Sequence, residues 1–197
     1  AHFHRVVDLS RELRQPWTTA DALTNLGIVL SLQGDYAAAQ SHFEEAFRIY
    51  QERGSPVWST DPLCALTENA IRQGDLPAAR SWLHDATARS ASSGIRWLHV
   101  LVGHFSGLLA YYEGQPERAA TMLEETAALA REHQFMPDLA RSLVALGRVR
   151  HAQGDLHRAT ARLQEGLRLF QQMNHKLGAV TALEALAELA LGTDAQN

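Results

Sequence analysis

Residues 33–43 read QGDYAAAQSHF, and close variants of this stretch recur at 73–83 (QGDLPAARSWL), 114–123 (GQPERAATML) and 153–163 (QGDLHRATARL). Their glycines are 40 residues apart each time, at positions 34, 74, 114 and 154. A fixed period of this length is the sequence signature of a repeat protein, in which each unit packs on its neighbours. The repeat therefore decides the fold class of this chain.

Each unit carries the spacing of two amphipathic helices, because its apolar residues recur every three or four positions. Tyr36, Ala39, Phe43 and Ala46 follow this spacing in one helix of the first full unit. The pattern predicts an all-α chain of ten helices, at residues 3–14, 18–33, 36–53, 59–73, 76–92, 97–113, 116–133, 138–153, 156–173 and 177–191.

The recurring stretch itself is predicted to be the turn between the two helices of a unit. We expect Gly34 to end one helix in the left-handed conformation. Asp35 then accepts hydrogen bonds from the exposed N–H groups of the next helix. In the third copy Gln115 replaces the aspartate, and Pro116 follows at a position where a helix tolerates proline well.

Stacking the chain at 40-residue intervals reveals columns of small residues. One column holds Ala39, Ala79, Ala119 and Ala159, and another holds Gly27, Thr67, Gly107, Gly147 and Ala187. A third column, at positions 43, 83, 123 and 163, holds only Phe or Leu. The small columns predict close approach of two helices, because larger side chains there would force the helices apart.

The stretch NLGIVLSLQGDYAAAQSHFEEAFRI (25–49) resembles the tetratricopeptide repeat, through its Leu-Gly pair, its Gly-Asp-Tyr turn, and Ala39, Phe43 and Ala46. The resemblance implies a right-handed superhelical solenoid of antiparallel helix pairs. A period near 40 also fits a HEAT-like array by length alone, but the Gly-Asp turn and the small columns favour the tetratricopeptide interpretation. We expect a single array over 1–197, divided into a half repeat (1–17), four repeats (18–57, 58–97, 98–137, 138–177) and a half repeat (178–197).

In that family the first helix of each repeat lines a concave groove, and the resemblance places Asp21 and Ile28 on the groove side. The candidate binding residues that it implies are Asp61, Glu68, Leu101, His104, Leu108, Tyr111, Arg141, Arg148, His151 and Glu184. The expected partner is a protein or peptide segment, or another domain of the parent protein.

Gly103 occupies a column that elsewhere holds leucine, so the missing side chain leaves space in the third repeat. Neighbours such as Phe105 can refill this space, or it can persist as a pocket. The second alternative predicts a small-molecule sensor that binds its ligand near Gly103, His104 and Tyr111.

Arg141 and Arg148 are seven residues apart and share one helix face. They can hold a carboxylate or phosphate of a partner, or they can pair with acidic residues of the chain itself. The acidic candidates are Glu68, Glu184 and Glu188.

Composition excludes several other function classes. Net charge is −4 and pI is near 6.2, which argues against direct nucleic-acid binding. The ten histidines form no metal-ligand pattern, no catalytic motif is present, and we predict no cofactor, no metal and no enzymatic activity. The single cysteine, Cys64, fits a reducing cytoplasmic setting. No apolar run approaches the roughly 20 residues that cross a bilayer.

The remaining signals concern packing and context. Trp17, Trp58 and Trp97 precede or begin first helices at near-period spacing, and we interpret them as packing residues between repeats. The half repeats predict exposed apolar faces at both ends, which the parent protein or an end-to-end homodimer would cover.

The 40-residue period resembles the helical sensor arrays of bacterial LuxR-type and related signal-transduction ATPases. The resemblance implies a non-catalytic regulatory module of a larger transcriptional regulator, and the chain, which begins without Met, is expected to be a piece of it.

Overall fold

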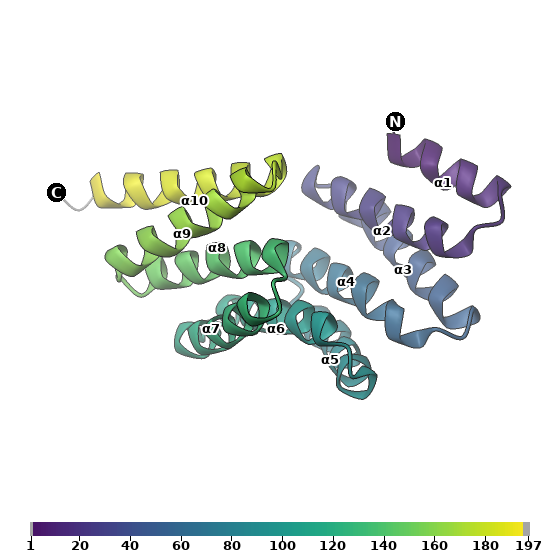
Figure 1. Cartoon of the computed structure of the whole chain (residues 1–197), viewed down its shortest axis with the longest axis horizontal. Helices are drawn as coiled ribbons and strands as arrows, with labels where there is room; N and C mark the ends of the chain where they lie inside the picture. The colour runs from purple at the N-terminus through teal and green to yellow at the C-terminus, as the bar shows by residue number, and fades with distance from the viewer. Residues whose placement is uncertain (1, 195–197) are drawn as a thin grey trace. The chain divides into compact units, whose positions relative to one another are not determined.

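The computed structural model describes residues 2–194, and this part of the chain contains ten α-helices and a short 3-10 helix. Their bounds are α1 (His2–Glu12), α2 (Pro16–Leu32), α3 (Tyr36–Glu52), η1 (Pro56–Ser59), α4 (Thr60–Arg72), α5 (Leu76–Ser93), α6 (Arg96–Tyr112), α7 (Pro116–Glu132), α8 (Met136–Ala152), α9 (Leu156–Gln172) and α10 (Lys176–Asp194). The predicted all-α fold of antiparallel helix pairs is confirmed (Figure 1). The sequence analysis missed only η1 among these elements.

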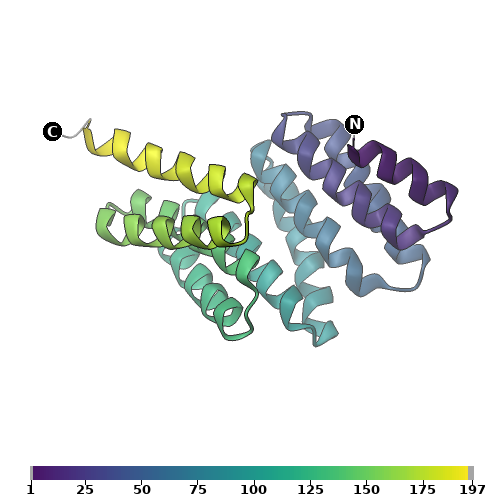
Figure 2. The same cartoon turned by 45° about the horizontal axis from the view of Figure 1, so that its top comes forward.

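The chain divides into two compact units, Ala1–Phe105 and Ser106–Asn197, with the boundary inside α6. In the first unit α2 packs against α1, α3 and α4, and α4 packs against α5. In the second unit α8 packs against α7, α9 and α10, and α10 lies along α9 in both views (Figures 1 and 2). The predicted grouping of the helices into one array with a half repeat at each end stays a prediction.

The turns inside the helix pairs are built as the sequence predicts. Gly34 has a φ of +86°, a left-handed conformation that costs glycine no Cβ clash. The carboxylate of Asp35 then accepts a hydrogen bond from the backbone N–H of Ala38 at 3.2 Å. The same cap recurs at 3.0 Å in the turns that begin α5 and α9, where the carboxylates are those of Asp75 and Asp155. Each cap satisfies a backbone donor that the helix itself leaves unpaired.

The small columns lie in the seam between paired helices. All four alanines of the first column are fully buried. A Cβ added to Gly27 of α2 would lie 2.5 Å from Cε1 of Phe43 on α3. In the second unit, a Cβ on Gly147 would lie 2.6 Å from Cγ of Leu163 and 3.2 Å from the carbonyl oxygen of Ala159. The small residues therefore make room both for a close backbone and for the large side chain of the facing column.

The second helix of each pair also ends in a left-handed residue, which the sequence analysis did not predict. These residues recur every 40 positions, at Arg14, Gly54, Gly94, Gln134 and Asn174, with φ between +52° and +69°. Only two of the five are glycine, so no glycine pattern marked this turn. A non-glycine residue in this region costs conformational energy, which the repeated turn geometry imposes.

Both end helices of the described chain, α1 and α10, have exposed apolar side chains on or next to them. Near the end of α1, Leu9 and Leu13 are more than half exposed, and on α10 the same holds for Leu177 and Leu183. The described helices include none with the combination of length and hydropathy that a bilayer crossing demands.

Candidate functional site

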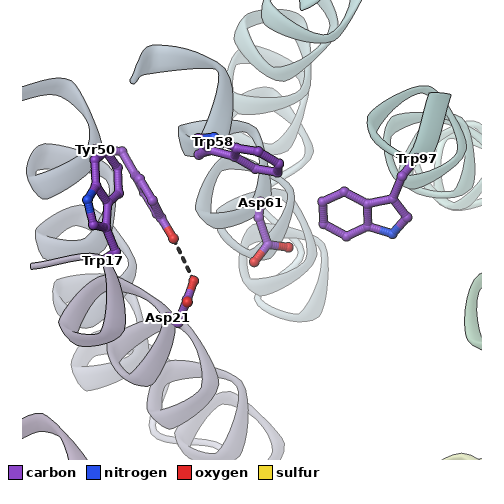
Figure 3. Close-up of a pocket in the computed structure, with 6 residues that line it drawn as sticks. All are labelled: Trp17, Asp21, Tyr50, Trp58, Asp61 and Trp97. Atoms are coloured by element: carbon purple, nitrogen blue, oxygen red, sulfur yellow. Dashed lines mark hydrogen bonds between the residues drawn. The ribbon is translucent and has the colours of Figure 1, made fainter. Parts of the chain in front are cut away.

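A pocket lies wholly within the first unit. Its volume is about 350 Å³, and its lining consists of three indoles, one phenol and two carboxylates: Trp17, Asp21, Tyr50, Trp58, Asp61 and Trp97. Figure 3 shows these side chains converging from four helices and η1. We call this site the tryptophan pocket.

Trp17, Asp21 and Tyr50 form one side of the tryptophan pocket. Pro16 begins α2, which places Trp17 in the first helical turn and Asp21 one turn later on the same face. The rings of Trp17 and Tyr50 have centroids 5.6 Å apart and planes tilted by 38°. The Tyr50 hydroxyl donates a hydrogen bond of 2.6 Å to Oδ1 of Asp21, and this bond fixes the carboxylate toward the pocket (Figure 3).

Trp58, Asp61 and Trp97 form the other side. Trp58 belongs to η1, and Asp61 follows it in the first turn of α4, where the helix dipole favours a negative charge. Trp97 lies in the first turn of α6, and its ring points toward Trp58 and Asp61 (Figure 3). The helix η1 and the first turn of α4 therefore place the indole of Trp58 and the carboxylate of Asp61 on the same side of the pocket.

The indoles of the pocket are accessible to a partner. Trp17 is 41% exposed and Trp58 is 44% exposed, whereas Tyr50 behind them is only 7% exposed. Clustered exposed aromatic side chains are uncommon on a protein surface that binds nothing, because their burial releases water. Packing between repeats, the role that the sequence analysis assigned to Trp17 and Trp58, therefore accounts for only part of their surface.

The phenol of Tyr50 is held in its protonated form. Burial raises the pKa of Tyr50 well above its ordinary value, and the hydrogen bond to Asp21 raises it further. The nearby charges of Asp21 and Asp61 add to this effect, because a phenolate would meet two carboxylates. At neutral pH the Tyr50 hydroxyl is thus a fixed hydrogen-bond donor.

Of the predicted site residues in the first unit, the structure brings only Asp61 into the tryptophan pocket, together with Asp21 from the same predicted groove. Glu68 lies further along α4, where its carboxylate accepts a 2.6 Å hydrogen bond from Arg72 beside a smaller pocket. Leu101 is 2% exposed and His104 is 7% exposed, so neither presents a surface to a partner in this structure.

The predicted residues of the second unit fall into two groups. Leu108 and Tyr111 are partly buried and pack on a core cluster that includes Leu123 and Leu146. The polar residues are at least partly exposed: His151 is half-buried and Glu184 is exposed.

The two predicted arginines of α8 both lie near acidic side chains of the same unit. Arg141 donates a hydrogen bond to Asp138, one turn earlier. A nitrogen of Arg148 is 3.8 Å from an oxygen of Glu188 on α10. Both contacts are internal pairings; Glu188 is one of the acidic candidates named from the sequence, whereas Asp138 is not.

Two signals could have revealed the tryptophan pocket from sequence. Trp17, Trp58 and Trp97 recur at intervals of 41 and 39 residues, and Asp21 and Asp61 are 40 residues apart. Together these intervals predict that indoles and carboxylates meet on neighbouring repeats. The interpretation of the tryptophans as packing residues hid this juxtaposition.

The described residues also bear on metal binding and on cysteine chemistry. Among residues 2–194 no three His, Cys, Asp or Glu side chains gather in a way that could hold a metal ion. Cys64, the single cysteine, is completely buried.

Comparisons with known proteins identify the repeat. Two sequence models described as tetratricopeptide repeat match the chain, one over residues 1–55 and the other over residues 62–85 and 140–165. Together these matches cover more than half of the 197 residues. No curated protein sequence matches the chain.

Solved structures share the fold at low sequence identity. BtubC (BKLC) from P. vanneervenii is 21% identical, with a TM-score of 0.61 over 87% of this chain and 72% of its own. Aspartyl phosphate phosphatase F from Bacillus subtilis is 12% identical, with a TM-score of 0.68 over 98% of this chain. The chain spans 54% of that phosphatase. PilF from Pseudomonas aeruginosa is 18% identical, with a TM-score of 0.55 over 86% of this chain and 75% of its own.

Proposed function

The chain belongs to the tetratricopeptide repeat family, and on that premise we propose that it is a non-catalytic module that binds a segment of a partner protein. Tetratricopeptide repeat modules typically bind proteins or peptides. In this chain the tryptophan pocket is the observation that supports such a role. Its two most exposed indoles, Trp17 and Trp58, offer a partner large rigid surfaces, and tryptophan is the residue type most enriched at binding hot spots.

The pocket's polar groups favour binding over catalysis. The raised pKa of Tyr50 keeps its hydroxyl protonated and bonded to Asp21, so it is neither a nucleophile nor a base. The carboxylates of Asp21 and Asp61 come from different helices, and both lie among aromatic rings (Figure 3). Such an arrangement orients and holds a ligand.

The polar residues predicted on the first helices of each unit remain part of the proposal. Asp61, Glu68, Arg141, Arg148 and Glu184 all keep exposed or half-buried side chains. Within the first unit a partner segment would meet the acidic side chains of α4, and within the second unit a partner segment would meet the basic side chains of α8.

We also propose a regulatory context, in which this module is part of a larger bacterial signal-transducing regulator of transcription. The 40-residue period and the long links between repeats, such as the one that contains η1, support this context. The sequence that flanks these residues in the full-length gene tests it. A nucleotide-binding motif on one side or a helix-turn-helix on the other would support it, and flanks without either would overturn it.

The alternative function is a small-molecule sensor with its ligand near Gly103, His104 and Tyr111. These residues belong to different units of the chain, and the site stays a prediction. Replacing Gly103 with leucine separates the two functions. It would abolish ligand-induced thermal stabilisation if the sensor site exists, and it would leave peptide binding at the tryptophan pocket unchanged.

The exposed apolar residues of α10 support a proposal about one further partner. In this proposal a second copy of the chain packs end to end against α10. Leu177, Val180 and Leu183 are each about half exposed along this helix. Sedimentation equilibrium tests the proposal by comparing the native chain with Leu183→Glu. A concentration-dependent dimer that the substitution abolishes supports end-to-end pairing, and a native chain that is monomeric throughout overturns it.

Selection of peptides from a displayed random library against the whole chain tests the binding function. Selected peptides should bind the native chain and bind Trp58→Ala at least about tenfold more weakly, as expected for a hot-spot indole. Tyr112→Ala is the matched control, because Tyr112 is an exposed aromatic residue of α6 outside the pocket. No enrichment of peptides, or equal losses in the two variants, would overturn the proposal.

A further inference from the structure

All six residues that line the tryptophan pocket are aromatic or acidic. The lining therefore provides aromatic faces and negative charge but contributes no positive charge of its own. The volume of about 350 Å³ lies in the range of pockets that enclose a whole chemical group rather than a single water. The combination of shape and charge is what selects an occupant.

The aromatic rings favour a cation. The face of an indole carries negative potential, and tryptophan binds cations more strongly than tyrosine or phenylalanine does. Trp17 and Tyr50 present tilted neighbouring rings on one side, and Trp58 and Trp97 face the space from the other (Figure 3). A cationic group in this space would have aromatic rings on both sides of it (Figure 3). The chain already shows this type of contact at Arg89, whose guanidinium carbon is 5.3 Å from the ring centroid of Phe47.

The two carboxylates strengthen the same preference. Asp21 reaches the pocket from α2 and Asp61 from the start of α4, so their charges flank the space from separate elements. The negative charge of Asp61 acts on the other side of the pocket as well, since it helps to raise the pKa of Tyr50. An anionic occupant would be repelled by both carboxylates. A purely apolar occupant would lower the polarity around both carboxylates without offering them a positive charge, which is costly.

We infer that the tryptophan pocket binds a positively charged side chain of a partner peptide, with arginine preferred. The inference rests on the proposed peptide-binding function and names the residue chemistry that the pocket recognises. The guanidinium group is planar, so it can stack on an indole while its edge donates hydrogen bonds to carboxylates. It is also more weakly hydrated than an ammonium group and therefore loses less on entering an aromatic site.

Tryptophan fluorescence of the whole chain tests the inference, with N-acetylated, C-amidated Gly-Arg-Gly as the probe. We expect a saturable change that the citrulline analogue, which has the shape of arginine without its charge, produces at least about tenfold more weakly. The lysine analogue should bind with intermediate strength. Free guanidinium ion should bind more weakly than the arginine peptide, and equally tight binding would make the ligand a small cation and overturn the peptide assignment.

Matched variants assign the effect to the pocket. Asp61→Asn should weaken binding of the arginine peptide about tenfold, because a charge-assisted contact is lost without a change of shape. Asp85→Asn removes the same charge from an exposed position on α5 outside the pocket and should leave binding unchanged. Equal losses in the two variants would show that only the overall charge matters and would overturn the inference.

The outcome also separates this inference from the proposed function. Library peptides that lack basic residues but depend on Trp58 would preserve the binding function and overturn the preference for a cation. No saturable response to the arginine peptide up to about 10 mM, a range that reveals millimolar dissociation constants, would overturn the inference by itself. Failure of the library selection as well would overturn both.

Discussion

The helix pairs α2–α3 and α8–α9 share one packing framework but differ in chemistry at equivalent positions. Both place an alanine of the first small column, Ala39 or Ala159, in a fully buried seam. At the position where the first helix carries Asp21 in one repeat, it carries Arg141 in the other. Trp17 likewise corresponds to Pro137.

This difference teaches that the columns have separate tasks. Seam positions keep small or large residues in every unit because two helices must fit together there. Positions at the start of the first helices vary in residue type, because they do not set the distance between paired helices, and Trp17, Asp21 and Arg141 there are exposed or half-buried. The residues that depart from the repeat are therefore the ones that distinguish one repeat's surface from another's.

The largest expected effect comes from breaking the shared framework. Ala39→Leu and Ala159→Leu should each destabilise the chain by about 2–3 kcal/mol, because the buried seam has no room for the added atoms. Chemical denaturation measures both. Ala37→Leu, on the exposed side of α3, is the control and should change stability little. Similar losses at positions 37 and 39 would contradict the assignment of the seam.

Exchanging a tyrosine and a phenylalanine sharpens the comparison. Tyr50 on α3 corresponds to Phe170 on α9, three periods later. Tyr50→Phe should cost about 1 kcal/mol, because it removes the hydrogen bond to Asp21. Phe170→Tyr should cost about 1–3 kcal/mol, because Phe170 is buried and the residue equivalent to Asp21 is Arg141. The new hydroxyl would therefore lack the carboxylate that accepts the hydrogen bond of Tyr50. Denaturation curves in which both substitutions are neutral would contradict the role given to the Tyr50 hydroxyl.

The Tyr50 hydroxyl also predicts a pH dependence. Its pKa is raised in the folded chain, so the stability it contributes is fully present below about pH 10, the ordinary tyrosine pKa, and is lost as pH rises above that value. The stability advantage of the native chain over Tyr50→Phe should therefore shrink between about pH 10 and pH 12. An advantage that grows over this range would contradict the direction of the shift.

The smallest effect is expected at the left-handed turns. Gln134 has a φ of +58°, so Gln134→Gly should stabilise the chain by about 0.5 kcal/mol, after the greater flexibility of glycine in the unfolded state is deducted. The reverse change, Gly54→Gln, should destabilise it by about 1 kcal/mol. Thermal melting measures both, and a destabilising Gln134→Gly would contradict the strain assigned to this turn.

The sequence was sufficient for most of the fold. Each Gly-Asp turn predicts a left-handed end and a cap, and each small column predicts a seam, because these features are local or repeat at a fixed interval. The turn at Gln134 was missed because no glycine marks it, although it closes through a local backbone hydrogen bond of 2.9 Å from the N–H of Phe135 to the carbonyl oxygen of Ala130. The helix η1 was missed because Pro56 and Trp58 begin it within a link that shows no helical period.

The candidate site was less predictable. The groove pattern found Asp21 and Asp61, but it also included Leu101 and His104, which the structure buries. Helical spacing alone cannot tell whether a neighbouring helix covers a given face. The spacing of the tryptophans can be read from the sequence. The contact between Trp17 and Tyr50, however, depends on the end of α3 lying beside the start of α2.

The indole N–H signals of the four tryptophans provide the most direct measurement of the central claim, that the tryptophan pocket is where this chain recognises a cation. In ¹H–¹⁵N spectra of the whole chain, the arginine peptide should shift the signals of Trp17, Trp58 and Trp97 and leave that of Trp82 on α5 in place. Assignment by single Trp→Phe substitutions identifies each signal. A shift confined to Trp82, or no shift among the three pocket tryptophans at saturating peptide, would contradict the account.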